Sequence, residues 1–418
     1  MANVYARALA LPGAWQFSGS AFIARLPLSM AGLGTVLLIS TLSGSYAEAG
    51  TVVASYGVVG ALGSIVSARL ADRWGQNRLL PILAVLDTAA LLTVVALELH
   101  HAPLIATMAA AAVAGFTAPP IGSFVRARWV HVTNDPATLR SGFALESIVD
   151  EVIFTVGPLL TAWLAFTFAL PLPLYVACGL TLVGSLLLAL QRGSQPVVHH
   201  EARTRRRSAL ALPGVALVVL ASLGMGALFG ADEVTTVAFA RIAGADTATG
   251  IVLGLFAVGS MLGGLFFGAR HWHAPLARQG ALLLTALLIG IAILPWMRSV
   301  LTLTIATFVA GLLVAPCLIV LFSFAERLVP AAQLTEGLTW TSSALGIGFA
   351  IGSVCGGALV DSHGTTAGFW LCTGSVAWSL LWIVAGQRTL LAHAAPGPAP
   401  LAPISLVGSS PFVMLTHP

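Results

Sequence analysis

The chain has 418 residues, of which 58% are hydrophobic and only 8% are charged, and its mean hydropathy is +0.95. Soluble domains carry about 25% charged residues, so this composition excludes a soluble globular protein and indicates a polytopic membrane protein. The formal net charge is +4, with 19 arginines and no lysine. We assign this excess of arginine to membrane topology rather than to binding of nucleic acid.

Twelve apolar segments are long enough to cross the hydrocarbon core of a bilayer, which takes about 20 helical residues. In chain order they are 17–41, 47–68, 79–99, 102–125, 141–168, 170–190, 212–233, 247–268, 279–296, 299–325, 336–360 and 365–387. The first segment lacks the charged start and the cleavage site of a signal peptide, so we expect a retained helix. The predicted fold class is an all-α polytopic membrane protein with twelve transmembrane helices.

Arginine is distributed unevenly between alternate loops. If the N-terminus is cytoplasmic, sixteen arginines lie in cytoplasmic segments, while only Arg241 and Arg298 lie in outer loops and Arg25 lies inside the first span. The sixteen are Arg7, Arg69, Arg73, Arg78, Arg126, Arg128, Arg140, Arg192, Arg203, Arg205, Arg206, Arg207, Arg270, Arg278, Arg327 and Arg388. Cytoplasmic loops of membrane proteins carry such an excess. We therefore predict a multi-pass protein of the cytoplasmic (inner) membrane with both termini cytoplasmic.

The two halves of the sequence resemble each other. ALALPG occurs at 8–13 and again at 209–214, and GTVVASYGVVGALGS at 50–64 parallels GIVLGLFAVGSMLGG at 250–264. Paired six-helix repeats are a transporter architecture, with the substrate site between the halves near mid-membrane. We expect two pseudo-symmetric six-helix bundles, 1–190 and 212–390, joined by a cytoplasmic linker, 191–211, and followed by a disordered cytoplasmic tail, 391–418.

The loop after the second segment reads ARLADRWGQNR at 68–78. It resembles the signature of the major facilitator superfamily, Gly-x-x-x-Asp-Arg-x-Gly followed by basic residues, at the position where that family has it. Asp72, Arg73 and Gly75 match the signature, whereas Ala68 replaces its first glycine and Gln76-Asn77 replace the usual basic pair before Arg78. Together with the twelve-segment topology, this motif identifies the chain as resembling a drug-efflux-like bacterial branch of the family.

The resemblance implies a cytoplasmic latch between the two halves. Asp72 would cap the positive N-terminal end of the eleventh helix, where Glu336 lies, while Arg73 pairs nearby. The corresponding loop of the second half, GARHWHAPLAR at 268–278, has no acid, so the latch is expected to be one-sided. We expect a gating role for Asp72, Arg73, Gly75, Arg78 and Glu336.

Gly157-Pro158 in the fifth segment is similar to the antiporter motif of the family, a Gly-Pro flanked by small residues. Thr161 and Ala162 stand where Gly-Gly is usual, and Ile153 replaces a glycine, so the match is partial. Small residues and proline also serve close helix packing in membranes. The motif favours efflux by antiport, and import or facilitated passage is the alternative.

Charged residues in three helices of the first half lie at a similar depth. At about 1.5 Å per residue, Arg25, Asp87, Asp150 and Glu151 are roughly 12–15 Å into their spans, and Glu146 is roughly 7 Å in. Carboxylates at such depth are costly unless they are neutralised, paired or hydrated. We predict an ion pair of Arg25 with Asp150 or Glu151. Asp150, Glu151 and Glu146 are candidates for proton coupling, a static charge network is the alternative, and a structural role is favoured for Asp87.

Asp232 and Glu233 end the seventh segment, so we expect them near the outer face, as solvated acids, an outward gate or a site that attracts cations. A central cavity is expected between the first, fourth, seventh and tenth helices. Its candidate lining residues, besides these two acids, are Met30, Phe116, Pro119, Met225, Phe229 and Pro316. Because the lining is mostly apolar, it favours an amphipathic or apolar solute over a sugar.

The leading hypothesis from the sequence is a secondary transporter that moves small amphipathic molecules by alternating access, with proton-coupled efflux. The alternatives are an importer or facilitator of a small metabolite and a non-transporting membrane protein. No metalloprotease, intramembrane protease or nucleotide-binding motif occurs, so we expect no enzyme. The four cysteines lack metal-site spacing, and no metal or cofactor is expected. Expected partners are a small-molecule substrate, protons and the bilayer, with the chain a monomer.

Overall fold

The computed structural model describes residues 6, 8–133, 135–196, 210, 212–270, 272, 274–329 and 334–387. The elements are α2 (Ala14–Leu42), α3 (Tyr46–Trp74), α4 (Gln76–Leu99), α5 (Leu104–Thr117), α6 (Ile121–Val132), α7 (Pro136–Thr167), α8 (Leu172–Leu190), α9 (Pro213–Ile242), α10 (Ala248–Ala269), α11 (Leu276–Ile291), α12 (Val300–Gly311), α13 (Val314–Leu328), α14 (Leu334–His363) and α15 (Thr365–Ala385), with short 3₁₀ turns at Arg192–Ser194 and Leu294–Trp296. The predicted tail and most of the predicted linker lie outside the described residues.

Twelve helical spans are long and apolar enough to cross a membrane, as predicted. The fourth span is broken into α5 and α6, and the tenth into α12 and α13. In the fourth, Ala118 takes an extended ψ of 123° before Pro119-Pro120, because the residue before a proline avoids helical geometry and proline has no N–H to donate. The corresponding spans of the two halves thus share an interrupted helix.

Two helices extend beyond the predicted segments. The second span runs on to Trp74, so Asp72 and Arg73 lie in the last turn of α3 rather than in a loop. The seventh span runs on to Ile242, nine residues past Glu233. The predicted segment, 212–233, ends at these acids, but several apolar residues that follow are buried and continue the helix.

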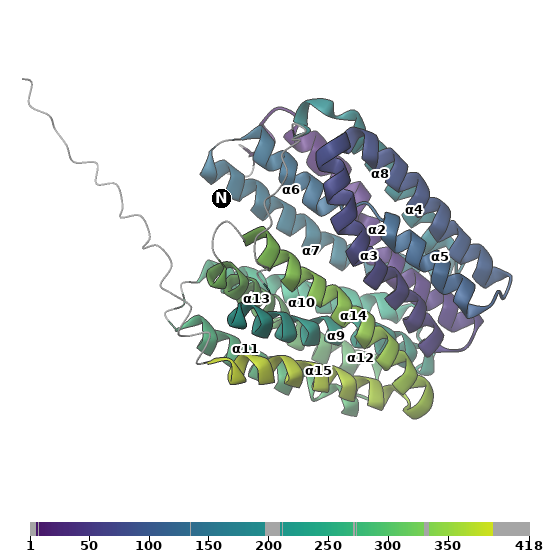
Figure 1. Ribbon diagram of the computed structural model, residues 1–418. Helices are drawn as coiled ribbons and strands as arrows, with labels where there is room; N and C mark the ends of the chain where they lie inside the picture. Colours follow the sequence, from purple (N-terminus) through teal and green to yellow (C-terminus); the bar gives the residue numbers. More distant parts are fainter. Residues whose placement is uncertain are drawn as a thin grey trace, which may run out of the picture.

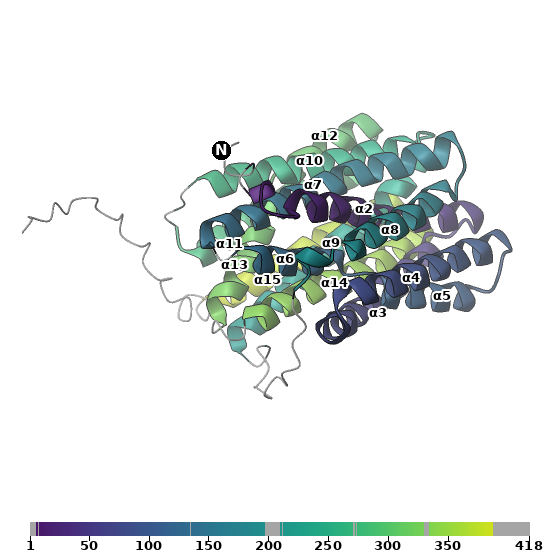
Figure 2. The same cartoon turned by 90° about the horizontal axis from the view of Figure 1, so that it is seen from above.

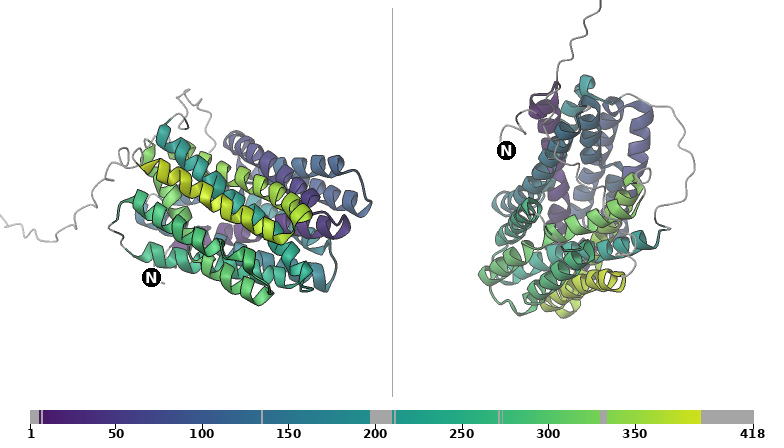
Figure 3. Two further views of the ribbon diagram at one scale, coloured as in Figure 1. Left: turned by 90° about the horizontal axis from the view of Figure 1, so that it is seen from below. Right: turned by 90° about the vertical axis from the view of Figure 1, so that its left-hand side faces the viewer.

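The first six spans (purple to blue) lie beside the last six (green to yellow), as seen in Figure 1. Figure 2 shows the two places where the halves adjoin most closely: α7 lies beside α10, and α3 lies beside α14. One end of the molecule carries Asp72 and the start of α2, and we call it the Asp72 end. The other carries Asp361, in the last turn of α14, and we call it the Asp361 end. Figure 3 (right) views the protein from the Asp72 end.

The hydrophobic core joins the two halves at the Asp361 end. One buried cluster there combines Leu37 of α2 and Val53 of α3 with Val234 of α9 and Leu253 of α10. The other buried clusters among the described residues each belong to a single half, for example the one around Trp129 in the first half. Among the described residues, apolar burial therefore seals the interface between halves at the Asp361 end.

Glycines permit the close approach of α3 to α14. A Cβ added to Gly50 would lie 2.1 Å from the carbonyl oxygen of Ser353, and one added to Gly357 would lie 2.2 Å from that of Tyr46. No such atom fits, so these backbones are in direct contact. This is the small-residue packing that membrane helices use where no hydrophobic effect drives them together.

Replacing Gly50 with alanine should therefore lower the melting temperature of the purified protein in detergent. The added methyl group would separate α3 from α14, and overpacking of this kind costs about 1–3 kcal/mol. The matched control is Gly57→Ala on the same helix, where nothing lies within 4 Å of the new Cβ. That change should be neutral or slightly stabilising, because alanine favours helix over glycine. Equal melting temperatures for the two variants would contradict the packing described here.

Candidate functional site: membrane-embedded charges

Arg25 of α2 lies between two carboxylates of α7. Its Nη1 donates to Asp150 Oδ1 at 2.8 Å, and its Nη2 contacts Glu146 Oε2 directly. The predicted ion pair between Arg25 and Asp150 is present, and the one considered with Glu151 is not. Glu146 and Asp150 are one turn apart on the same face of α7, so a single guanidinium reaches both and relieves their mutual repulsion.

Glu146 is the most enclosed member of this group. Its side chain is fully buried, and besides Arg25 it accepts hydrogen bonds from Ser18 Oγ at 2.7 Å and Trp129 Nε1 at 2.9 Å. A buried carboxylate with an ion-pair partner and two further donors has its acceptor capacity well satisfied. This arrangement ties α2, α6 and α7 together and suits a permanent charge better than a proton carrier.

Asp150 is more open, with 30% of its side chain exposed, and it also accepts from Arg126 Nη2 at 3.0 Å. Arg126 was missed as a site residue because we ended the fourth segment at 125 and assigned this arginine to a loop. The structure continues the span as α6 to Val132. A helical signal was present in the sequence: the stretch from Ile121 contains no glycine or proline beyond its first turn.

Glu151 and Asp87 do not join the network, although we placed them at the same depth. Glu151 follows Asp150 by one residue and so points about 100° away around the helix. Asp87 is buried on α4, beside the contact of Thr88 with Cys178 of α8, and its Oδ1 has no hydrogen-bond partner. Neither acid forms an ion pair with any residue that the structure describes.

Asp232 and Glu233 lie inside the membrane span and not near its outer face, which corrects our expectation. Asp232 is 2% exposed. Its Oδ1 and the Oε1 of Glu233 have no hydrogen-bond partner, and no ion pair to either acid occurs within the described part of the chain. Glu233 points toward the first half: a Cβ placed on Gly32 of α2 would lie 3.4 Å from its Oε1.

The residues of the Asp-Arg-x-Gly motif separate into an exposed and a buried part. Asp72, Arg73 and Arg78 are exposed, and their side chains form no ion pair with a described residue. Gly75 ends α3 with a φ of 82°, a conformation that favours glycine. The side chain of Glu336 lies outside the described residues, so its predicted place beside Asp72 stays a prediction.

Arg128 of α6 anchors the start of α4 to the end of α8. Its guanidinium is fully buried and donates to Gln76 Oε1 at 2.9 Å, to Ser194 Oγ at 2.9 Å and to the carbonyl of Leu188 at 2.9 Å. Gln76 takes the place of a basic residue in the motif. The amide oxygen that accepts from Arg128 gives a physical reason for this departure, because a cation there would repel the guanidinium.

Gly157-Pro158 lies where α7 contacts helices of both halves. A Cβ on Gly157 would lie 1.8 Å from Ser29 Oγ of α2, and the carbonyl oxygen of Pro158 would lie 2.6 Å from a Cβ on Gly250 of α10. The glycines thus bring α7 close to its own half on one side and to the second half on the other. A side chain at Gly157 would disturb the packing of α7 against α2, and one at Gly250 would disturb the interface between halves.

The predicted lining residues are for the most part packed in this structure. Met30, Met225 and Pro316 are buried within the cores of their own halves, and Phe229 packs edge-on against Phe256. Of the two residues of the fourth span, Phe116 is exposed and Pro119 is half-buried.

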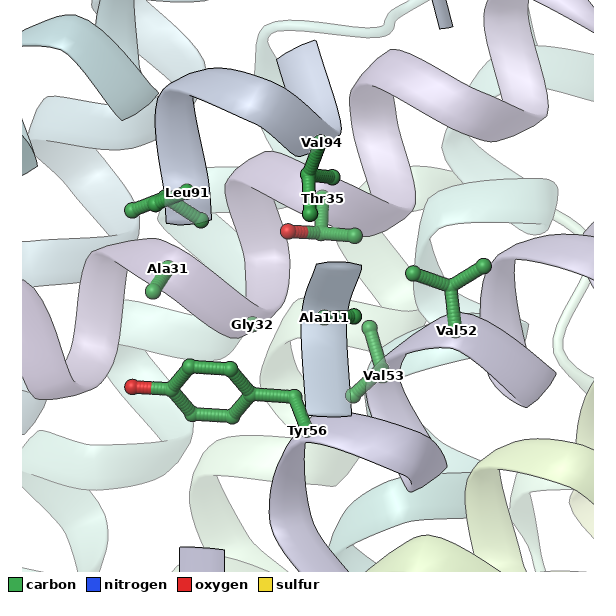
Figure 4. Close-up of a pocket in the computed structure, with 9 residues that line it drawn as sticks. All are labelled: Ala31, Gly32, Thr35, Val52, Val53, Tyr56, Leu91, Val94 and Ala111. Atoms are coloured by element: carbon green, nitrogen blue, oxygen red, sulfur yellow. The ribbon is translucent and has the colours of Figure 1, made fainter. Parts of the chain in front are cut away.

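A small cavity lies among α2, α3, α4 and α5, with Thr35, Tyr56 and Leu91 in its wall (Figure 4). Its free volume is about 10 Å³, about the room that one water molecule needs. It is too small for a transported solute, and all of its lining residues belong to the first half. It is therefore a packing cavity of the first half.

Comparison with known proteins gives a consistent result. The family model described as Major Facilitator Superfamily matches residues 17–289. No curated protein matches the sequence. Solved structures with the same fold include the nucleoside transporter NupG (TM-score 0.68, 16% identity, 90% of this chain and 98% of that one). A POT family transporter in complex with 5-aminolevulinic acid (0.66, 16%, 91% and 97%) is similar. So is a bacterial homologue of the iron transporter ferroportin in an inward-facing state (0.67, 14%, 89% and 98%). At these identities the likeness concerns the fold.

Proposed function

Since the chain belongs to the Major Facilitator Superfamily, we propose that it is a secondary transporter that exports small amphipathic molecules in exchange for protons. The observation that carries the proton coupling is the pair Asp232 and Glu233, two adjacent carboxylates inside a membrane span without a cationic partner among the described residues. An unpaired carboxylate at membrane depth is expensive as an anion. Binding a proton removes that cost.

The position of Glu233 suits a coupling role. Substrate and ion sites of such transporters lie between the halves near the bilayer midplane. Glu233 is nine residues, roughly 14 Å, before the end of α9 at Ile242, and it faces Gly32 of the other half. Its neighbour Val234 already belongs to the sealed core that joins the halves. When the halves separate at the Asp361 end, Glu233 is placed to meet water there, so its proton affinity would depend on which end is open.

The charge network on α7 supplies the second part of the proposal. Asp150 is shared between Arg25 and Arg126 and is partly exposed, so it can exchange partners when α2 and α7 move. Glu151 has no ion-pair partner among the described residues and lies one position further along the helix. We keep Asp150 and Glu151 as candidates for proton transfer, and we assign Glu146 and Arg25 to holding the network in place.

The direction of transport, the substrate class and the orientation are inferred from the Gly157-Pro158 motif, the expected cavity and the arginine distribution. The partial antiporter motif Gly157-Pro158 lies at the contact between α7 and α10 and supports exchange rather than passage in one direction. The mostly apolar residues of the expected cavity favour amphipathic solutes. The arginine distribution supports insertion in the cytoplasmic membrane with both termini inside.

Transport by purified protein in liposomes with an imposed pH gradient tests this proposal. A panel of amphipathic cations, nucleosides, peptides and 5-aminolevulinic acid covers the hypothesis and the solutes named for the similar structures. We expect an amphipathic compound to be driven against its gradient toward the acidic side, with alkalinisation of that side. Accumulation toward the alkaline side would indicate proton symport and import, and equilibration that ignores the gradient would indicate a facilitator. Either result would overturn the antiport assignment.

A further inference from the structure

Asp361, the last acid of α14, caps a helix of the other half. Its Oδ2 accepts from Ser45 Oγ at 2.8 Å and from the backbone N–H of Ala47 at 2.8 Å, and its Oδ1 accepts from the N–H of Tyr46 at 3.0 Å. These two N–H groups belong to the first turn of α3 and have no partner within their own helix. A carboxylate at a helix N-terminus is stabilised by the hydrogen bonds and by the helix dipole together.

Arg241, in the last turn of α9, makes the complementary contact. Its Nη1 donates to the carbonyl oxygen of Ser40 at 2.8 Å, and its Nη2 contacts Thr41 Oγ1. The carbonyl groups at the end of α2 lack partners in their own helix, and a cation there is favoured by the dipole. The guanidinium also lies 5.8 Å from the ring centroid of Tyr46.

Two charges of the second half therefore hold the turn between α2 and α3 of the first half. Asp361 binds the positive helix end that begins after this turn, and Arg241 binds the negative helix end before it. We call this arrangement, Asp361 and Arg241 on residues 40–47, the clamp. It closes over the apolar core that joins the halves, and Gly50 and Gly357 bring α3 and α14 into backbone contact beneath it.

Among the residues that the structure describes, no equivalent arrangement occurs at the Asp72 end. The side chains of Asp72 and Arg73 are exposed there and form no ion pair with a described residue. Among the described residues, contacts of charged side chains therefore hold the halves together at the Asp361 end and not at the Asp72 end. Alternating access requires that only one end is closed in any one state. Opening the Asp361 end must break every contact of the clamp, because each of them crosses from one half to the other.

We propose that Asp361 and Arg241 form the gate of the Asp361 end, and that their contacts with the ends of α2 and α3 set the balance between the two states of the transporter. The clamp contacts no expected substrate or proton site, so these are positioning residues. With the predicted orientation, the clamp faces the outside and the structure described here is the state that is closed to the outside. This proposal rests on the contacts between the halves, and it does not depend on proton coupling.

The test is the reaction rate of a cysteine at position 53 with a hydrophilic maleimide, in protein whose exposed Cys355 is replaced by serine. Val53 is 3% exposed in the sealed core, so the Val53→Cys side chain should react slowly in the parent. Adding Asp361→Ala or Arg241→Met should raise the rate roughly fivefold or more, which corresponds to a loss of about 1 kcal/mol or more in the preference for the closed state. Ser362→Ala, whose hydroxyl bonds only within its own helix and to its neighbour, is the matched control and should leave the rate unchanged.

A second cysteine separates gate opening from unfolding. Leu284→Cys lies in the core of the second half and is 1% exposed, so it should stay unreactive in all variants. Labelling at both positions would mean general loosening and would overturn the proposal, as would an unchanged rate at position 53 in both clamp variants. If Asp361→Ala cannot be purified as a folded protein, Arg241→Met carries the same test from the other helix. Because the readout is conformational, a failure of proton coupling would leave this result unaffected.

Discussion

Replacing Glu233 with glutamine is expected to abolish proton-driven export while preserving exchange of substrate across the membrane. Glutamine has nearly the shape of a protonated glutamate and stays neutral, so it fits against Gly32 without the cost of a buried charge. The variant can still alternate between its two states, but it has no proton to release. The measurement is the accumulation of substrate in liposomes under a pH gradient, compared with counterflow of labelled substrate without a gradient.

Glu326→Gln is the matched control, because it makes the same chemical change at an exposed position of α13 in the same half. It should retain both activities. Asp232→Asn tests which of the adjacent acids carries the proton: if Asp232 only supports its neighbour, this variant should keep part of the gradient-driven transport. Full uphill transport by Glu233→Gln, with unchanged proton movement, would rule out Glu233 as the coupling group.

Removing Arg25 should strongly destabilise the protein. In Arg25→Met, Glu146 would remain fully buried without a cation, and breaking a buried pair in this way costs about 3–5 kcal/mol. Asp150 would keep Arg126 and would suffer less. The measurement is thermal unfolding in detergent, and we expect a clear fall in melting temperature and in the yield of folded protein.

Two variants decide whether that loss comes from the unpaired charge. Arg126→Met removes an arginine that is 42% exposed and, as a surface pair, should cost about 0–1 kcal/mol. Arg25→Met combined with Glu146→Met replaces the buried pair by apolar side chains and should recover much of the stability lost in the single variant. If the double variant is less stable than Arg25→Met alone, the buried charge is not the cause.

The pairing of Arg25 could be anticipated because an arginine in the middle of a span requires an acid nearby. Which of the three carboxylates of α7 would pair with Arg25 could not be anticipated. Depth along the helix favoured Asp150 and Glu151, whereas the rotation of α7 toward α2 brings Glu146 and Asp150 to the arginine. Rotation of one helix against another is set by side-chain packing, which no local pattern encodes.

Asp232 and Glu233 show the opposite case, in which a local rule was misleading. Two adjacent acids in an apolar helix usually indicate the membrane boundary, because a charged group on an isolated helix is stable only where it contacts water. In the folded protein, α14 and α15 surround this part of α9 and enclose Asp232. Packing within the second half therefore encloses Asp232, whereas Glu233 lies against Gly32 of the first half, so the acids became candidates for coupling only when their surroundings were known.

The sequence by itself determined the twelve spans, the family signature from Asp72 to Arg78 and the need to neutralise Arg25, since hydropathy, motif spacing and the cost of buried charge are properties of short segments. The tertiary structure decided which end of the molecule is closed and by which residues. Asp361 reaches the first turn of α3 across 314 to 316 positions of the chain. A contact at that separation exists only because the two halves pack together, and it is lost whenever they part.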